Sequence, residues 1–86
     1  MASRLPVTNI RETVYGILRD HMPGYSGPIE PELKLDSDLG LDSLEFYQLV
    51  GDVEEGLGFR GDERDLLNIV TVGDLVGYAE RQSNPG

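Results

Sequence analysis

The chain has 86 residues, which is enough for one small domain and too few for a cofactor domain beside a substrate domain. It contains no Cys, so disulfides and Cys-ligated zinc are excluded and a reducing cytoplasm is the expected compartment. Sixteen acidic residues against seven Lys and Arg give a net charge of −9, which disfavours binding to a nucleic-acid backbone. The charge either attracts a basic protein surface as partner or serves only to keep the chain soluble.

An amphipathic helix is predicted from about Thr8 to Met22. Its apolar residues recur at the spacing of one helical stripe: Ile10, Val14, Ile17 and Leu18. Either Thr8 or Asn9 can cap the helix, Asn9 as a pair with Glu12. Pro23-Gly24 is expected to end it.

A long loop is predicted from Pro23 to Asp42, because this segment is rich in Pro and Gly: Pro23, Gly24, Gly27, Pro28, Pro31 and Gly40. A loop of this length is unusual in a compact domain and is often functional. Leu33-Lys34-Leu35 alternates like a strand but is too short for one. Aliphatic side chains are expected to hold the loop against the core: Ile29, Leu33, Leu35 and Leu39.

A second helix is predicted to begin near Asp42-Ser43 and to end near Gly56-Leu57-Gly58. Gly51 inside it costs about 1 kcal/mol relative to Ala. Leu44 and Tyr47 lie off the apolar stripe on an adjoining face. The stripe itself consists of Phe46, Leu49, Val50, Val53 and Leu57. Acidic residues cover much of the remaining surface: Asp42, Glu45, Asp52, Glu54 and Glu55.

Two further helices are predicted after a short break. A short one runs from Asp62 to Asn68, with Asp62 as its cap and Leu66 and Ile69 facing inward. The last begins at Thr71, whose hydroxyl pairs with Asp74 as a short version of the capping box, and frays by Gln82. Its apolar stripe is Val72, Leu75, Val76 and Ala79.

These elements predict an all-α fold, a small four-helix bundle with three longer helices, one short helix and a long loop between the first two. We expect a single domain over residues 1–86, with an ordered core of about 7–82 and loose termini at 1–6 and 83–86. No stretch approaches the roughly 18 apolar residues of a membrane span, and the first residues lack the apolar centre of a signal peptide. A cytoplasmic location is therefore expected. We also expect the chain to be a monomer.

Catalytic and metal-binding patterns are weak. His21 is the sole histidine, and at a helix end it is more typical of a helix-dipole partner than of a general base. No G-x-S-x-G turn or phosphate loop occurs. The carboxylates between Asp36 and Asp42 are spaced like those of a calcium loop. However, the third ligand, the glycine and the final glutamate of that loop are replaced by Gly40, Leu41 and Tyr47, so no metal site is expected.

The segment Asp38-Leu39-Gly40-Leu41-Asp42-Ser43-Leu44 places a serine where a Gly-containing loop enters an acidic helix. By itself, such a serine is equally typical of a helix cap. A phosphate attached there would meet free backbone N–H groups and the positive end of the helix dipole. The segment resembles the prosthetic-group motif of the acyl carrier proteins. The order of elements extends the resemblance over nearly the whole chain, through Glu54-Glu55-Gly56-Leu57-Gly58-Phe59 and Thr71-Val72-Gly73-Asp74-Leu75.

The resemblance implies a carrier without catalytic activity. In that family, a phosphopantetheinyl transferase uses coenzyme A and magnesium to attach 4′-phosphopantetheine to the motif serine, which corresponds to Ser43. The matching motif residues are Gly40, Leu41, Asp42 and Leu44. The arm's thiol holds acyl groups as thioesters for acyl-transferring, condensing and tailoring enzymes. Because the chain has no Cys, that thiol would be the only one in the modified protein.

Partner enzymes with basic patches are expected to dock beside Ser43, on the acidic and apolar residues Leu44, Glu45, Tyr47, Asp52, Glu54 and Glu55. Such contacts mainly set the encounter rate and its salt dependence. For Leu44 and Tyr47, ordinary partly exposed packing is the competing interpretation.

Several positions depart from the family pattern. Gly61-Asp62 stands where a bulky apolar residue and Pro are common, Gln48 replaces a Glu of many fatty-acid carriers, and Gly51 replaces a larger apolar residue. A carrier for polyketide or other specialised biosynthesis is therefore at least as well supported as a fatty-acid carrier. Leu41-Asp42-Ser43 in place of Gly-Gly-His-Ser disfavours a peptidyl or aminoacyl carrier but leaves it open. The alternative of another class is a small acidic helical interaction protein that is never modified.

Overall fold

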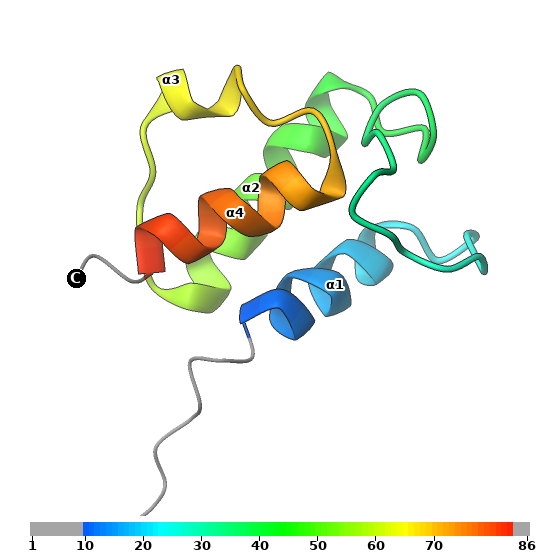
Figure 1. Ribbon diagram of the computed structural model, residues 1–86, viewed down its shortest axis with the longest axis horizontal. Helices are drawn as coiled ribbons and strands as arrows, with labels where there is room; N and C mark the ends of the chain where they lie inside the picture. The colour runs from blue at the N-terminus through cyan, green and yellow to red at the C-terminus, as the bar shows by residue number, and fades with distance from the viewer. Residues whose placement is uncertain (1–9, 84–86) are drawn as a thin grey trace, which may run out of the picture.

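A computed structural model describes residues 10–83 of the chain (Figure 1). Its helices are α1 (Ile10–His21), α2 (Ser43–Leu57), α3 (Glu63–Leu66) and α4 (Val72–Ser83). The segment between α1 and α2 is a long loop, as predicted. The all-α prediction of three longer helices and one short helix is confirmed. No helix within the described residues has the length and apolar character needed to cross a bilayer.

The helices α1, α2 and α4 pack pairwise around one core, and α3 lies at its edge (Figure 1). The stripes predicted for the three longer helices face this core, with Ile17, Phe46 and Leu57 only partly buried. Three core residues, Met22, Leu41 and Tyr78, were not among the predicted apolar positions. The buried residues are Ile10, Val14, Leu18, Met22, Ile29, Leu35, Leu41, Leu49, Val50, Val53, Ile69, Val72, Leu75, Val76, Tyr78 and Ala79.

The ends of α2 are fixed by strong caps. Asp42 is the N-cap: its side chain accepts the Glu45 N–H at 2.8 Å, and the Glu45 side chain accepts the Asp42 N–H at 3.1 Å. Gly58 closes the helix with φ of 77°, in the left-handed region that glycine adopts without strain. These boundaries confirm the predicted start and end of the helix.

The other helix ends agree less evenly with prediction. At α4, the Asp74 N–H donates to Thr71 Oγ1 and the Thr71 N–H donates to Asp74 Oδ2, each at 3.1 Å, which confirms the predicted cap pair. Asp62 caps α3, but that helix ends at Leu66 rather than Asn68. The chain beyond it continues in tighter i→i+3 turns, because α3 has no fully buried residue to hold a longer helix. The cap candidates Thr8 and Asn9 lie outside the described residues.

The loop before α2 is anchored to the start of α4. Ile29 and Leu35 are buried, and Leu33 and Leu39 pack partly against the core, as expected. An isolated antiparallel bridge joins Lys34 to Thr71. The two hydrogen bonds beside this bridge run from the Leu35 N–H to the Val70 carbonyl and from the Val72 N–H to the Leu33 carbonyl, both at 2.9 Å. The loop therefore enters α2 from a fixed direction.

Candidate functional site

The turn before α2 is built from local hydrogen bonds that use the motif residues. The Gly40 N–H donates to the Asp36 carbonyl at 2.9 Å, and the Leu41 N–H donates to the Leu35 carbonyl at 3.1 Å. Gly40 has φ of 77°, a conformation that residues other than glycine rarely adopt. This conformation explains why glycine occupies this position of the motif. Leu41 then turns into the core and anchors the turn.

Ser43 is the first residue of α2 and is exposed. Asp42, one residue earlier, already provides the side-chain cap. The Ser43 hydroxyl is therefore not needed as a cap, and within the described residues no hydrogen bond engages it. This resolves the ambiguity in the sequence: the aspartate stabilises the helix start and the serine presents an available hydroxyl.

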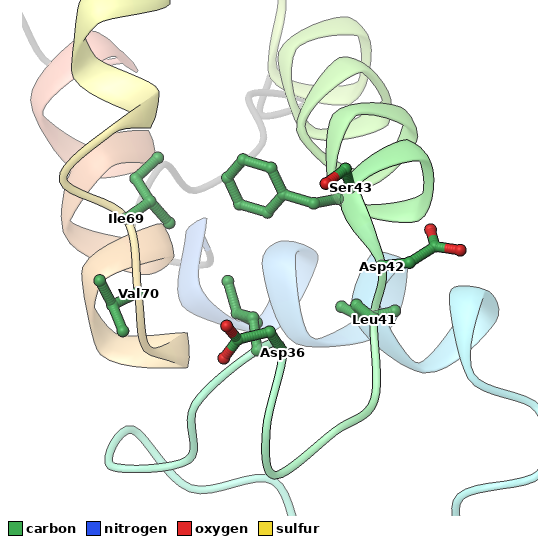
Figure 2. Close-up of a pocket in the computed structure, with 8 residues that line it drawn as sticks. Asp36, Leu41, Asp42, Ser43, Ile69 and Val70 are labelled. Atoms are coloured by element: carbon green, nitrogen blue, oxygen red, sulfur yellow. The ribbon is translucent and has the colours of Figure 1, made fainter.

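An open pocket of about 420 Å³ lies beside Ser43. Figure 2 shows Ile69 and Val70, from the segment before α4, across the opening from Ser43 and Asp42. Most of its lining is apolar: Leu35, Asp36, Leu41, Asp42, Ser43, Phe46, Ile69 and Val70. The exposed hydroxyl is thus adjacent to a surface that aliphatic groups can contact.

The predicted docking residues fall into two groups. Leu44 and Tyr47 are 66% and 54% exposed, so they lie on the surface of α2 rather than in the core. Glu45 and Glu55 are also exposed, although Glu45 takes part in the N-terminal capping box. These residues follow Ser43 along α2 as an apolar and acidic surface.

Asp52 and Glu54 interact with other parts of the chain. The Oδ2 atom of Asp52 lies 2.5 Å from Nε2 of His21, which joins the middle of α2 to the end of α1. Glu54 is half-buried, and its Oε2 atom accepts the Tyr78 hydroxyl at 2.8 Å and the Gly61 N–H at 3.0 Å. Glu54 therefore has a structural role that the sequence analysis did not anticipate.

Tyr78 and Gly61 complete this internal contact. Tyr78 is 0% exposed, and burial, reinforced by the hydrogen bond to Glu54, raises the pKa of its phenol well above the ordinary value. A Cβ atom on Gly61 would lie 1.6 Å from the Tyr78 hydroxyl oxygen, so only glycine allows this approach. Tyr78 follows Leu75 by three residues, and that helical spacing was the available signal for its burial.

The acidic residues before α2 bond to the loop itself. Asp38 Oδ2 accepts the Lys34 N–H at 2.8 Å, and Asp36 Oδ1 accepts the Ser37 N–H at 2.6 Å. Over residues 10–83, no group of three or more His, Cys, Asp or Glu side chains is placed to hold a metal ion. These carboxylates shape the turn that leads to Ser43.

Comparisons with known proteins agree on one family. The family described as "Phosphopantetheine attachment site" matches residues 24–79, which include the loop, Ser43 and most of α4. An acyl carrier protein of Thermotoga maritima is 39% identical over 82 residues, spanning 95% of this chain and 98% of that protein. Acyl carrier protein MbtL of Mycolicibacterium paratuberculosis is 36% identical over 75 residues, spanning 87% and 84%. A solved Mycobacterium tuberculosis structure, assigned as an acyl carrier protein, superposes with a TM-score of 0.74 at 30% identity, covering 80% of this chain and 92% of that one.

Proposed function

The chain belongs to the acyl carrier protein family, whose domain carries covalent 4′-phosphopantetheine, and we propose that Ser43 is the attachment residue in this chain. The family prediction made from the motif is thereby confirmed. The observation that carries the proposal is the exposed Ser43 hydroxyl, which has no hydrogen bond within the described residues because Asp42 caps the helix.

The surroundings of Ser43 suit a phosphodiester. The first N–H groups of α2 have no partner inside the helix, and the positive end of the helix dipole lies at the same place. A phosphate on the Ser43 oxygen meets both favourably. When attached, the group supplies a thiol on a flexible arm, and this chain's own residues hold the arm's base and contribute an adjacent apolar wall at Phe46 and Ile69.

As a carrier, the protein would present acyl thioesters to other enzymes, and those enzymes would supply the catalytic groups. Proteins of this family work with a phosphopantetheinyl transferase and with biosynthetic enzymes. We place this chain in the cytoplasm as a monomer serving fatty-acid, polyketide or another specialised biosynthesis. The departures at Gln48, Gly51 and Gly61 make a specialised route at least as well supported as a general fatty-acid role.

Partner enzymes would dock on the surface formed by Leu44, Glu45, Tyr47, Asp52 and Glu55. We leave Glu54 out of this surface, because it is half-buried and its Oε2 atom accepts from Tyr78 and Gly61. Asp52 stays in the surface, because it is exposed despite its contact with His21. The exposed apolar residues supply contact area, and the acidic residues attract basic patches over a range of about 8 Å at physiological ionic strength.

A thiol titration tests the carrier role, because the chain has no Cys. The protein is incubated with a phosphopantetheinyl transferase, coenzyme A and Mg²⁺, and free coenzyme A is then removed. One reactive thiol per chain is expected after incubation, against none before it. If no thiol appears, the chain is an unmodified acidic interaction protein instead.

A further inference from the structure

Asp36 places a second carboxylate in the pocket beside Ser43, and the cap of α2 does not use it. The other carboxylate in the lining belongs to Asp42, whose Oδ1 atom accepts the Glu45 N–H. Asp36 is exposed, and its Oδ1 atom accepts the Ser37 N–H at 2.6 Å. No hydrogen bond engages its Oδ2 atom within the described residues. The pocket therefore contains a carboxylate oxygen that is available as an acceptor.

The loop holds Asp36 in a defined place. Its carbonyl accepts the Gly40 N–H at 2.9 Å, and the preceding Leu35 N–H donates to the Val70 carbonyl at the same distance. This second bond ties the loop to the opposite chain segment. Figure 2 shows Asp36 and Val70 across the opening from Ser43. Because the backbone around the carboxylate is already ordered, a donor that reaches it bears a smaller entropic cost.

Apolar side chains form most of the remaining lining. Val70 is 47% exposed and Phe46 is only partly buried, so both present surface to a group that enters the pocket. The deeper lining residues are buried: Leu35, Leu41 and Ile69. The pocket thus suits a group that combines apolar bulk with a hydrogen-bond donor, and Ser43 itself borders the pocket.

Phosphopantetheine has this combination next to its phosphate. The phosphate is followed by a carbon that bears a pair of methyl groups, then by a hydroxyl group and an amide N–H. The carboxylate of Asp36 repels the phosphate, which is favoured instead at the N-terminus of α2. The same carboxylate attracts the hydroxyl and amide donors that follow. The methyl groups gain by leaving water for the apolar lining.

We propose that the pocket beside Ser43 receives the methyl-bearing segment of the arm and that Asp36 positions this segment by accepting a hydrogen bond from the adjacent hydroxyl or amide. The inference rests on the proposed attachment at Ser43 and extends it by naming the residues that hold the arm. It concerns the part of the arm next to the phosphate and leaves the thiol end available to partner enzymes.

NMR of the modified protein tests the position of the arm. Nuclear Overhauser contacts are measured between the arm's methyl groups and the protein. We expect contacts to the Phe46 ring and to the Val70 methyl groups, both of which line the pocket. A modified protein whose arm shows no contact with either residue would overturn the proposal.

Matched serine variants test the apolar wall. Val70→Ser removes exposed apolar surface from the pocket, so the arm should lose most of its contacts with the Phe46 ring. Leu67→Ser is the control, because Leu67 is 79% exposed on the same segment and does not line the pocket. It should leave the contacts unchanged. Contacts of equal intensity in the two variants contradict the proposal.

Matched amide variants test the carboxylate. Asp36→Asn and Glu32→Gln each remove one negative charge from the loop with little change in shape, and Glu32 is exposed and does not line the pocket. The asparagine can still accept the Ser37 N–H, but an amide oxygen accepts less strongly than a carboxylate. The arm's contacts with Val70 should weaken in Asp36→Asn and persist in Glu32→Gln. Equal intensities would show that Asp36 does not position the arm.

Failure of this inference can be told apart from failure of the proposed function. The mass and the thiol of each protein are measured before its spectrum. A chain that gains the arm but shows no contacts in the pocket keeps its proposed function and loses only this inference. A chain that gains no arm at Ser43 loses both. If Asp36→Asn does not fold, the comparison of Val70→Ser with Leu67→Ser decides the matter.

Discussion

Tyr78 joins three parts of the chain at a single hydroxyl. It stands on α4, donates to Glu54 on α2 and lies against Gly61 in the segment before α3. Its ring also packs edge-on against Phe59, with ring centres 5.6 Å apart. The Tyr78 hydroxyl thus joins α4 to Glu54 near the end of α2 and packs against the segment before α3.

Removing this hydroxyl should weaken the fold measurably. We expect Tyr78→Phe to lower the free energy of unfolding by about 1–2 kcal/mol, because a half-buried carboxylate loses one of two donors. Urea denaturation gives the value. Tyr47→Phe is the control, since Tyr47 is exposed and no hydrogen bond engages its hydroxyl within the described residues. Equal losses in both variants would show that the buried hydroxyl contributes nothing specific.

Contacts between single side chains were the features that could be predicted least completely from the sequence. The motif and the Thr71–Asp74 pair follow local rules and could be assigned from spacing alone, whereas the sequence left the cap of α2 open between Asp42 and Ser43. The bond between Glu54 and Tyr78 spans 24 positions along the chain, and no periodic pattern records it. An acidic residue on a helix surface therefore looks like a docking residue until its partner is known.

At the start of α2, Asp42 caps the helix and Ser43 presents an exposed hydroxyl. Asp42→Ala removes the capping box and should cost about 0.5–2 kcal/mol. Ser43→Ala should stay within about 0.5 kcal/mol of the parent, as exposed substitutions usually do. Thermal or chemical unfolding of the two unmodified variants gives the comparison. A larger loss from Ser43→Ala than from Asp42→Ala would mean that the serine is the true cap.

The start of α4 depends on a carboxylate that becomes less effective in acid. The N–H groups of Val70 and Thr71 donate to Asp74 and hold the pKa of its carboxyl below the usual value. A lowered pKa in the folded state contributes stability above the unfolded pKa of about 4, and that stability is lost as the pH falls through the folded pKa.

Asp74→Asn should therefore remove part of the loss of stability on acidification. Melting temperature is measured from about pH 7 down to about pH 3, across the range in which a carboxyl group titrates. Asp20→Asn serves as the control, because Asp20 is exposed and makes no hydrogen bond within the described residues. Parallel curves for Asp74→Asn and the parent protein would contradict the assigned role.

Elements were predicted well wherever a strong local signal marked them. The apolar stripe, the Asp42-Ser43 pair and the glycines at 56 and 58 located α2 to within a residue or two at each end. The predicted α3 was too long because Leu66 is its only substantial inward anchor, and tight turns replace the missing helix. The bridge that holds the loop to the start of α4 joins Lys34 and Thr71, which are distant in sequence, so only the folded chain reveals it.

The whole molecule carries a net charge of −9, so its field attracts basic partners from any direction. If partners dock beside Ser43, the acidic residues of α2 should affect association more than acidic residues elsewhere on the surface. We expect Glu55→Lys to slow arm transfer by a phosphopantetheinyl transferase and to flatten its dependence on salt. Glu80→Lys makes the same change of net charge on the exposed surface of α4 and should slow transfer less. Equal effects would indicate a response to net charge alone.

For the whole molecule, both the fold and the family could be predicted from the sequence, because the order of the helices and one motif are enough to indicate them. The pocket beside Ser43 is made by residues from the loop, from α2 and from the segment before α4. Gly51 and Gly61 could be recognised as departures from the family pattern, but their effect on the surface depends on how α2, α3 and α4 pack.

The intact mass of the protein after reaction with a phosphopantetheinyl transferase, coenzyme A and Mg²⁺ tests the assignment of Ser43 most directly. Ser37→Ala is the matched control, because Ser37 is also exposed and lies six positions earlier, in the loop before α2. The parent chain and Ser37→Ala should each gain the mass of one phosphopantetheine group, and Ser43→Ala should gain none. A mass gain in Ser43→Ala would contradict the account, because the arm would then be carried by another residue.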